Sequence, residues 1–340
     1  MTTHTRRLAA IGLVLAGIAA AIAVGWRQIA ISLAPTKQAS PSRSAEAIAA
    51  DSVFWQTLHS GAYDQLPQAI EVLTRAYLAT PGDAVTASHV GWLHIWRLAE
   101  ASRLDSAPAS ITDDIVLSRK YFQEAVALDP ADARKLGFLG AAMVAEGTVD
   151  RNEKLIRRGY YTLRDAIEAW PEFNLFTAGY VMSRTLKESS QFREALEWQW
   201  RTLDLCAERT IDRENPDYSR AMALETQQGA KRVCWNSWIA PHNFEGFFLN
   251  MGDMLVKSGD WQTAQKVYAI ARLSRTYSEW PYRSVLEQRI RQARENTALF
   301  NAAGSGGRTG LMIRSAFACM ACHQASGPVA TPQAPSGRLP

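Results

Sequence analysis

Small and large apolar residues recur at fixed spacing along the middle of the chain. A small residue is followed by a large one four positions later, a second small residue three positions after that, and a proline five positions further on. This pattern occurs at Ala69, Leu73, Ala76 and Pro81, at Ser118, Phe122, Ala125 and Pro130, and at Gly159, Leu163, Ala166 and Pro171, and it returns at Ala264, Tyr268 and Ala271 with Thr276 in place of the proline. Steps of three and four residues put side chains on one face of an α-helix, and proline stops a helix. Each occurrence therefore predicts a helix that packs closely on a partner and ends at a turn.

A second pattern precedes these helices and predicts their partners. An apolar residue stands three positions before an apolar-glycine pair, and another bulky residue follows. It occurs at Leu136, Leu139-Gly140 and Met143, at Leu175, Ala178-Gly179 and Met182, and at Phe248, Met251-Gly252 and Leu255, with a weaker copy at Val90-Gly91 and His94. Together the two patterns predict helical hairpins, each made of a first and a second helix.

The paired patterns resemble those of the tetratricopeptide repeat family. The last unit, from Phe248 to Thr276, keeps that family's twelve-residue step between Gly252 and Ala264. The resemblance implies an all-α solenoid over residues 52–300, in which about five irregular hairpins stack into a right-handed superhelix with a concave face for protein partners. A polar stretch at residues 207–241 interrupts the repeat, and we interpret it as an insertion.

The chain after the last hairpin carries the most specific chemical signal. A polar helix from Pro281 to about Leu299 is expected to cap the solenoid, and residues 301–310 form a Gly-rich linker. Residues 311–340 form an expected flexible tail that contains Cys319-Met320-Ala321-Cys322-His323. A flexible ten-residue linker spans about 17 Å on average, so whatever this motif binds is expected close to the last hairpin and the capping helix.

The pentapeptide is typical of covalent c-type haem attachment. Two thiols three positions apart add to the two vinyl groups of one haem, and the adjacent histidine ligates the iron. We therefore predict one covalent haem c on Cys319 and Cys322, with His323 as an axial ligand. Two alternatives stay open: a structural metal site, which would need ligands from elsewhere, and a redox-active dithiol.

The sixth ligand of the iron is open. No residue after His323 can coordinate iron, so the resemblance to cytochrome c is confined to the pentapeptide. Met312, just upstream, and His242, directly after the insertion, are possible sixth ligands. His59, His89 and His94 are further candidates from the repeats, although His94 occupies a packing position and is expected to be a core histidine. A five-coordinate iron and a ligand from a partner also remain open.

The N-terminus predicts export. Arg6 and Arg7 precede an apolar run from Leu8 to Val24, and haem of this type is attached outside the cytoplasm. We interpret residues 1–35 as a signal anchor that crosses a bacterial inner membrane once, with the bulk of the chain in the periplasm and residues 36–51 as a stalk. Cleavage after the small residues near Ala23 is the alternative.

Two further cysteines, Cys206 and Cys234, remain after haem attachment. Because the expected compartment is oxidising, we predict that Cys206 and Cys234 form a disulfide. The alternative is two buried thiols that are not bonded to each other.

Composition excludes some function classes but does not identify the function. The chain has 340 residues, 47% of them hydrophobic and 21% charged, and a net charge of +4. The charge is small, no basic cluster is interleaved with aromatic residues, and no phosphate-binding loop or hydrolase motif occurs, so we expect no nucleic-acid partner and do not favour an enzyme. Two function classes remain: an electron-transfer or haem-bearing accessory subunit that joins a redox protein or membrane complex, and a haem-free scaffold whose motif is a metal or redox-thiol site. A haem sensor or peroxidase-like enzyme is a weaker third.

Overall fold

The computed structural model describes residues 25–101, 104–106, 108–222, 228–235 and 245–301. The chain divides into two units, residues 1–38 and residues 39–340. In the first unit, residues 25–32 are helical. In the second, all regular structure within the described ranges is helical, which confirms the all-α prediction. No helix in these ranges has the length and apolarity needed to cross a membrane, and the predicted anchor, Leu8–Val24, lies outside them.

Ten helices of the second unit form five hairpins in the described ranges. The hairpins are α2 (Ala45–Ser60) with α3 (Leu66–Ala79), α4 (Ala84–Ala99) with α5 (Ile111–Leu128), α6 (Ala133–Val149) with α7 (Glu153–Ala169), α8 (Pro171–Met182) with α9 (Ser190–Ala207), and α11 (Glu245–Ser258) with α12 (Trp261–Ile270). Helix α13 (Arg283–Asn301) follows and packs on α11 and α12. Apart from the closing prolines and Thr276, the residues of both sequence patterns lie in the helices that the patterns predict. The one exception is Ala271, which lies in a 3-10 turn that continues α12.

The two sequence patterns meet in the interior of the hairpins. A Cβ on Gly140 of α6 would lie 2.9 Å from the backbone oxygen of Gly159 in α7, and 2.9 Å from the backbone nitrogen of Leu163. The two helix backbones therefore touch, and neither glycine can carry a side chain without moving them. The glycines of the other first-helix patterns also lie against a side chain of the second helix: Gly91 against Phe122, Gly179 against Gln199 and Gly252 against Tyr268.

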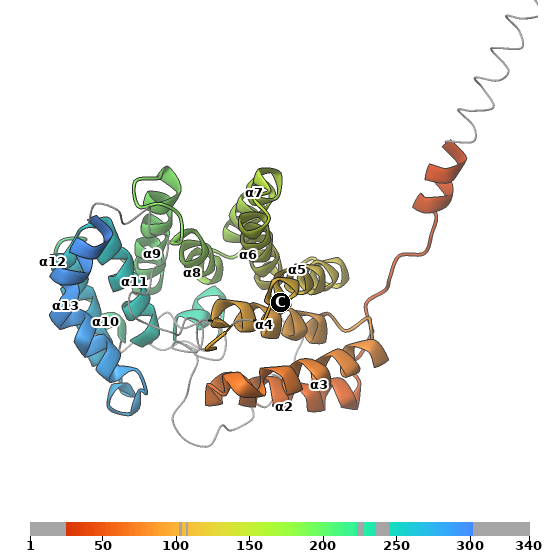
Figure 1. Ribbon diagram of the computed structural model, residues 1–340, viewed down its shortest axis with the longest axis horizontal. Helices are drawn as coiled ribbons and strands as arrows, with labels where there is room; N and C mark the ends of the chain where they lie inside the picture. The colour runs from red at the N-terminus through yellow and green to blue at the C-terminus, as the bar shows by residue number, and fades with distance from the viewer. Residues whose placement is uncertain (1–24, 102–103, 107, 223–227, 236–244, 302–340) are drawn as a thin grey trace, which may run out of the picture. The chain divides into compact units, whose positions relative to one another are not determined.

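Successive hairpins of the second unit follow one another in an arc (Figure 1). Helices α4, α6, α8 and α11 lie on its inner side, and α5, α7, α9 and α12 lie on its outer side. Contacts between α6 and α8, and between α2 and α4, join the first helices of neighbouring hairpins. The last helix, α13, buries Leu286, Ala293 and Phe300.

Helix α2 begins inside the segment that the sequence assigned to the stalk. The Ser44 side chain accepts a hydrogen bond from the backbone N–H of Ala47 and caps the helix, so α2 starts at Ala45 rather than after residue 51. Ala47, Ala50 and Phe54 are buried. The Ser- and Ala-rich composition suggested a linker, but these alanines are core residues at helical spacing.

A disulfide joins Cys206, in the last turn of α9, to Cys234, in the 3-10 helix η3 (Ala230–Trp235). Both cysteines are fully buried, with Cα atoms 5.7 Å apart. The predicted pairing is confirmed. The insertion that it closes includes the short helix α10 (Ser219–Met222) and a buried Tyr218.

Candidate functional site

The predicted haem residues lie outside the described part of the chain. Cys319, Cys322, His323 and the two possible sixth ligands, Met312 and His242, belong to ranges that the structure does not describe. Their roles stay predictions. Within the described ranges, no group of three or more His, Cys, Asp or Glu residues is arranged to hold a metal ion.

All three histidines of the repeats are buried, with 1%, 9% and 4% of their surface exposed for His59, His89 and His94. The Nδ1 atom of His94 lies 2.7 Å from Oδ1 of Asp114, which confirms the prediction that His94 is a core histidine. His59 stacks on Trp55, and His89 stacks on Phe54 with ring centroids 3.9 Å apart. If one of these three histidines ligated the iron, its side chain would have to leave its packed position.

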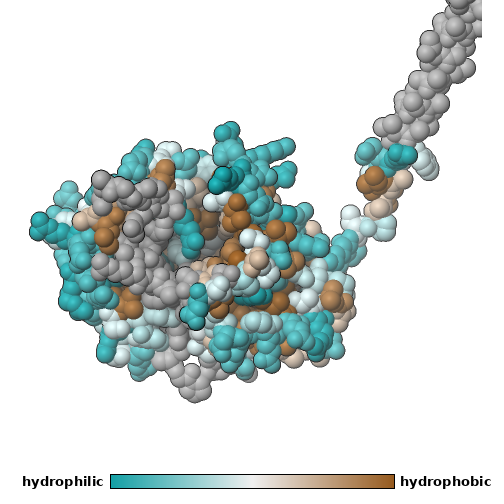
Figure 2. Space-filling view, in the orientation of Figure 1, coloured by the Kyte–Doolittle hydropathy of each residue, from teal (hydrophilic) through white to brown (hydrophobic). Residues whose placement is uncertain are grey.

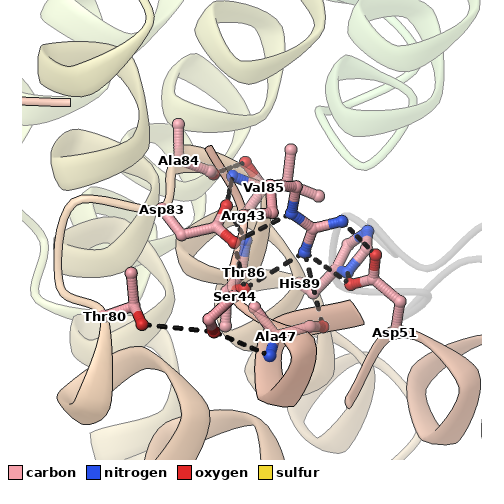
Figure 3. A network of polar contacts seen from close by, with 11 residues as sticks. Arg43, Ser44, Ala47, Asp51, Thr80, Asp83, Ala84, Val85, Thr86 and His89 are labelled. Atoms are coloured by element: carbon pink, nitrogen blue, oxygen red, sulfur yellow. Dashed lines mark hydrogen bonds and ion pairs between the residues drawn. The ribbon is translucent and has the colours of Figure 1, made fainter. Parts of the chain in front are cut away.

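A network that the sequence did not predict surrounds Arg43 (Figure 3). Nε of Arg43 donates to Oδ2 of Asp83 over 2.8 Å, and its two terminal nitrogens donate to the carboxylate of Asp51. The side chain of Asp83 caps α4 by accepting from the backbone N–H groups of Val85 and Thr86. We call Arg43, Asp51, Asp83, Thr86 and His89 the Arg43 clasp, because it ties the segment before α2 to both α2 and α4.

The charged groups of the clasp stabilise one another's ionised forms. Burial would raise the pKa of Asp51, but hydrogen bonds with His89 and Arg43 outweigh it and hold that pKa below its ordinary value. Burial likewise opposes the charge on Arg43, and the two carboxylates raise the pKa of its guanidinium nonetheless. Nδ1 of His89 lies 2.9 Å from Oδ1 of Asp51, so an ionised Asp51 accepts a hydrogen bond from the Nδ1–H group of His89. The clasp is thus a charged joint between the first two hairpins rather than a set of reactive groups.

A second feature of the inner helices is a row of aromatic side chains. Ring centroids are 4.2 Å apart for Trp92 and Phe138, 5.6 Å for Phe138 and Phe173, and 5.5 Å for Phe176 and Phe247. The row crosses from α2 through α4, α6 and α8 to α11. We define the inner aromatic row as the following residues: Phe54, Trp92, Trp96, Phe138, Phe173, Phe176, Tyr180 and Phe247.

The rings of the row differ in burial. Trp92, Phe176 and Tyr180 are partly buried, whereas Phe138 and Phe173 are buried. Figure 2 shows hydrophobic surface on the inner side of the arc, where α4 and α6 lie. Aromatic rings of this kind offer flat apolar contact surface, and edge-to-face packing fixes their orientation. The row therefore contributes apolar packing rather than acid-base chemistry.

The end of α13 lies beside the end of α8. Nζ of Lys187, in the turn after α8, donates to Oδ1 of Asn301 over 2.7 Å. Nζ of Lys257, near the end of α11, donates to the carbonyl oxygens of Ser183 and Thr185 after the same helix, over 2.7 and 2.8 Å. The chain therefore leaves the described part of the solenoid next to the helix that carries Phe176 and Tyr180.

No family model, curated protein or solved structure matches this chain. The candidate site therefore rests on the residues themselves.

Two signals in the sequence could have found the features that were missed. Asp83 stands directly before α4, as an N-cap does, and its side chain needs a cation to balance its buried charge. An aromatic residue also stands within six positions of each first-helix glycine: Trp92 near Gly91, Phe138 near Gly140, Phe176 near Gly179 and Phe247 near Gly252.

Proposed function

We propose that this chain is a membrane-anchored periplasmic protein that carries one covalent c-type haem and serves as an electron-transfer or accessory subunit of a larger complex. The observation that carries the proposal is the pentapeptide from Cys319 to His323. Thioether bonds to Cys319 and Cys322 would hold the haem, and His323 would ligate the iron, which supplies one-electron chemistry when bound.

The disulfide supports the proposed compartment. Cys206 and Cys234 are bonded to each other, and Cys319 and Cys322 are the remaining cysteines of the chain. Structural disulfides are stable in oxidising compartments such as the periplasm, where c-type haem is also attached. The basic and apolar N-terminal segment from Arg6 to Val24 supplies the expected export signal and inner-membrane anchor.

The helical hairpins support the role of a subunit rather than an isolated carrier. Stacked hairpins of the tetratricopeptide type form extended surfaces for protein partners, and the inner aromatic row provides apolar contact area on such a surface. We propose a redox protein or membrane complex as the partner class and no nucleic acid.

The decisive experiment is covalent haem retention. The full chain, produced with a c-type haem maturation system, should give a haem-stained band on a denaturing gel. The Cys319→Ser/Cys322→Ser variant should lose this band, and each single variant should weaken it. The matched control is Cys206→Ser/Cys234→Ser, which removes two cysteines elsewhere and should keep the stain. A wild-type band without stain would favour the haem-free scaffold instead.

Spectra then test the ligands. His323→Ala should change the ferrous spectrum far more than Met312→Ala or His242→Ala, because His323 is held under the ring by its covalently bonded neighbour. Binding of carbon monoxide by the wild type would show an open or weakly held sixth position and favour sensing or catalysis over electron relay.

A further inference from the structure

The first described residues of the chain form a short helix whose large apolar side chains are exposed. Residues 25–32 are helical (the short red helix in Figure 1), and Leu33 continues the helical bonding by donating its N–H to the carbonyl of Ile29 over 2.9 Å. The exposed fraction is 67% for Trp26, 51% for Ile29, 68% for Ile31 and 77% for Leu33. No other stretch of this length in the described ranges exposes four large apolar side chains. Such a concentration indicates an interaction surface, whereas single exposed apolar residues are ordinary.

The exposed helix is amphipathic. Its apolar face consists of residues at the i, i+3, i+4 and i+7 positions, which are Trp26, Ile29, Ala30 and Leu33. Each helical residue advances by about 100°, so these four side chains fall within an arc of about 100°. The remaining surface carries the polar residues Arg27, Gln28 and Ser32, and Ile31 is the one apolar residue among them. A helix with this division suits the boundary between an apolar and a polar medium.

The chain before the helix points to lipid as that apolar medium. The apolar run Leu8–Val24 directly precedes it, and seventeen residues in a helix would extend over about 26 Å, close to the roughly 30 Å hydrocarbon core of a bilayer. A crossing that continued to Leu33 would be about 39 Å long and would bring Arg27 into hydrocarbon, where a charged side chain is strongly unfavourable. Trp26 suits the membrane-water boundary instead. These lengths favour a crossing that ends near Gly25.

We propose that residues 26–33 lie along the periplasmic surface of the membrane as an interfacial helix, with the apolar face in lipid and the polar residues among head groups and water. The proposal rests on the membrane anchor of the proposed function and deepens it, because the crossing ends at Gly25 and the rest of the segment binds the membrane surface. Six residues, 34–39, then lead to Ser40, whose N–H donates to the carbonyl of Gly82 over 2.9 Å. A connector of six residues spans at most about 22 Å. A tether this short favours partners that are themselves at the membrane surface.

Spin labels at successive positions measure the depth of each side chain. One cysteine at a time replaces residues 26–33 in the full-length Cys319→Ser/Cys322→Ser chain, so that the result does not depend on the haem. Because Cys206 and Cys234 are bonded to each other, the introduced thiol is the only free one. The labelled protein is reconstituted into vesicles of phosphatidylethanolamine and phosphatidylglycerol. Paramagnetic resonance then compares the accessibility of each label to oxygen, which dissolves in lipid, with its accessibility to a water-soluble nickel complex.

The two faces of the helix should give opposite results. The ratio of oxygen to nickel accessibility should be at least about fivefold higher on the apolar face, because that face of an interfacial helix lies about 5–10 Å into the boundary of head groups and acyl chains. The apolar-face variants are Trp26→Cys, Ile29→Cys, Ala30→Cys and Leu33→Cys, and the polar-face variants are Arg27→Cys, Gln28→Cys and Ser32→Cys. The matched control is Ile48→Cys on α2, where Ile48 is 53% exposed and the label should be accessible to nickel.

The outcomes separate the interfacial helix from the function on which it rests. A high oxygen ratio at all eight positions would overturn the proposal, because it would identify a crossing that continues to Leu33, and would leave the anchor intact. Nickel accessibility at all eight positions, in a chain that alkaline carbonate does not extract from the membrane, would also overturn the proposal and leave the proposed function intact. Spectral broadening that grows with the protein-to-lipid ratio, without alternation between the faces, would overturn it by identifying a second copy as the occupant. Alternation in a chain that carbonate does extract would support the interfacial helix and refute the membrane anchor.

Discussion

Replacement of Arg43 by methionine should selectively destabilise the first hairpin. Methionine keeps much of the apolar stem of arginine but leaves two carboxylates without their shared cation. Asp83 has 2% of its side chain exposed and Asp51 has 18%, so both retain little hydration to compensate. His89 still contacts Asp51, and the cap of Asp83 on α4 remains.

The size of the effect follows from burial. Removal of one partner from a buried ion pair costs about 3–5 kcal/mol. The side chain of Arg43 is 28% exposed, so water screens part of the interaction, and we expect about 2–3 kcal/mol. The clasp joins α2 to α4, and in a stack of hairpins each unit is stabilised by its neighbours, so the loss should be largest in α2 and α3.

Native-state hydrogen exchange measures this directly. Amides of α2 and α3 should exchange about 30- to 150-fold faster in Arg43→Met, the range that corresponds to 2–3 kcal/mol, while those of α13 should change little. Arg75→Met is the matched control, since Arg75 pairs with Glu71 on α3 with 75% and 69% of the side chains exposed and should matter by at most about 0.5 kcal/mol. Equal effects of the two substitutions, or uniform destabilisation of all helices, would refute the role of the clasp.

Three further predictions concern the packing and charges of the solenoid. Gly140→Ala and Gly159→Ala should each lower thermal stability by about 1–3 kcal/mol, although alanine favours helices by about 1 kcal/mol, because the added methyl meets backbone atoms of the facing helix; a rise in melting temperature would contradict the contact. Cys206 and Cys234 should resist alkylation in unfolded but unreduced protein, and their replacement by serine should cost about 3.5 kcal/mol or less, as expected for a bridge across 28 positions. Burial raises the pKa of Asp253 from 3.8 to about 6, against the opposing effects of Arg289 and Tyr268. Its contribution to stability is therefore fully present below pH 3.8 and is lost as the pH rises through 6. Urea titrations should show the free energy of unfolding fall by about 3 kcal/mol between pH 4 and 6, and Asp253→Asn should flatten this pH dependence.

The hairpins could be predicted from the sequence because their contacts are local. Gly140 and Leu163 meet across a single turn, and the small and large residues of the second-helix pattern recur in four of the five hairpins. Helix α13 could be predicted because it has its own helical pattern. The disulfide could be predicted because two cysteines in an oxidising compartment leave few pairing choices.

The Arg43 clasp and the inner aromatic row could not be predicted with the same rules. Arg43 meets Asp83 across 40 positions, and a lone arginine in a Ser-rich segment has no periodic context that reveals its partner. The rings of the row stand at different offsets from the glycine marks, at one position after Gly91 and two positions before Gly140. They align only because the hairpins are rotated relative to one another, and that rotation is set by the packing of neighbouring units.

The position of the tail shows how folding changes a conclusion drawn from linker length. From sequence, a ten-residue linker after the capping helix restricts the haem motif to that helix and the last hairpin, because they are the nearest elements along the chain. In the structure, α13 runs back along α11 and ends at Lys187, so the tail starts beside the fourth hairpin. The same short reach therefore includes the end of α8 as well as α11 and α12.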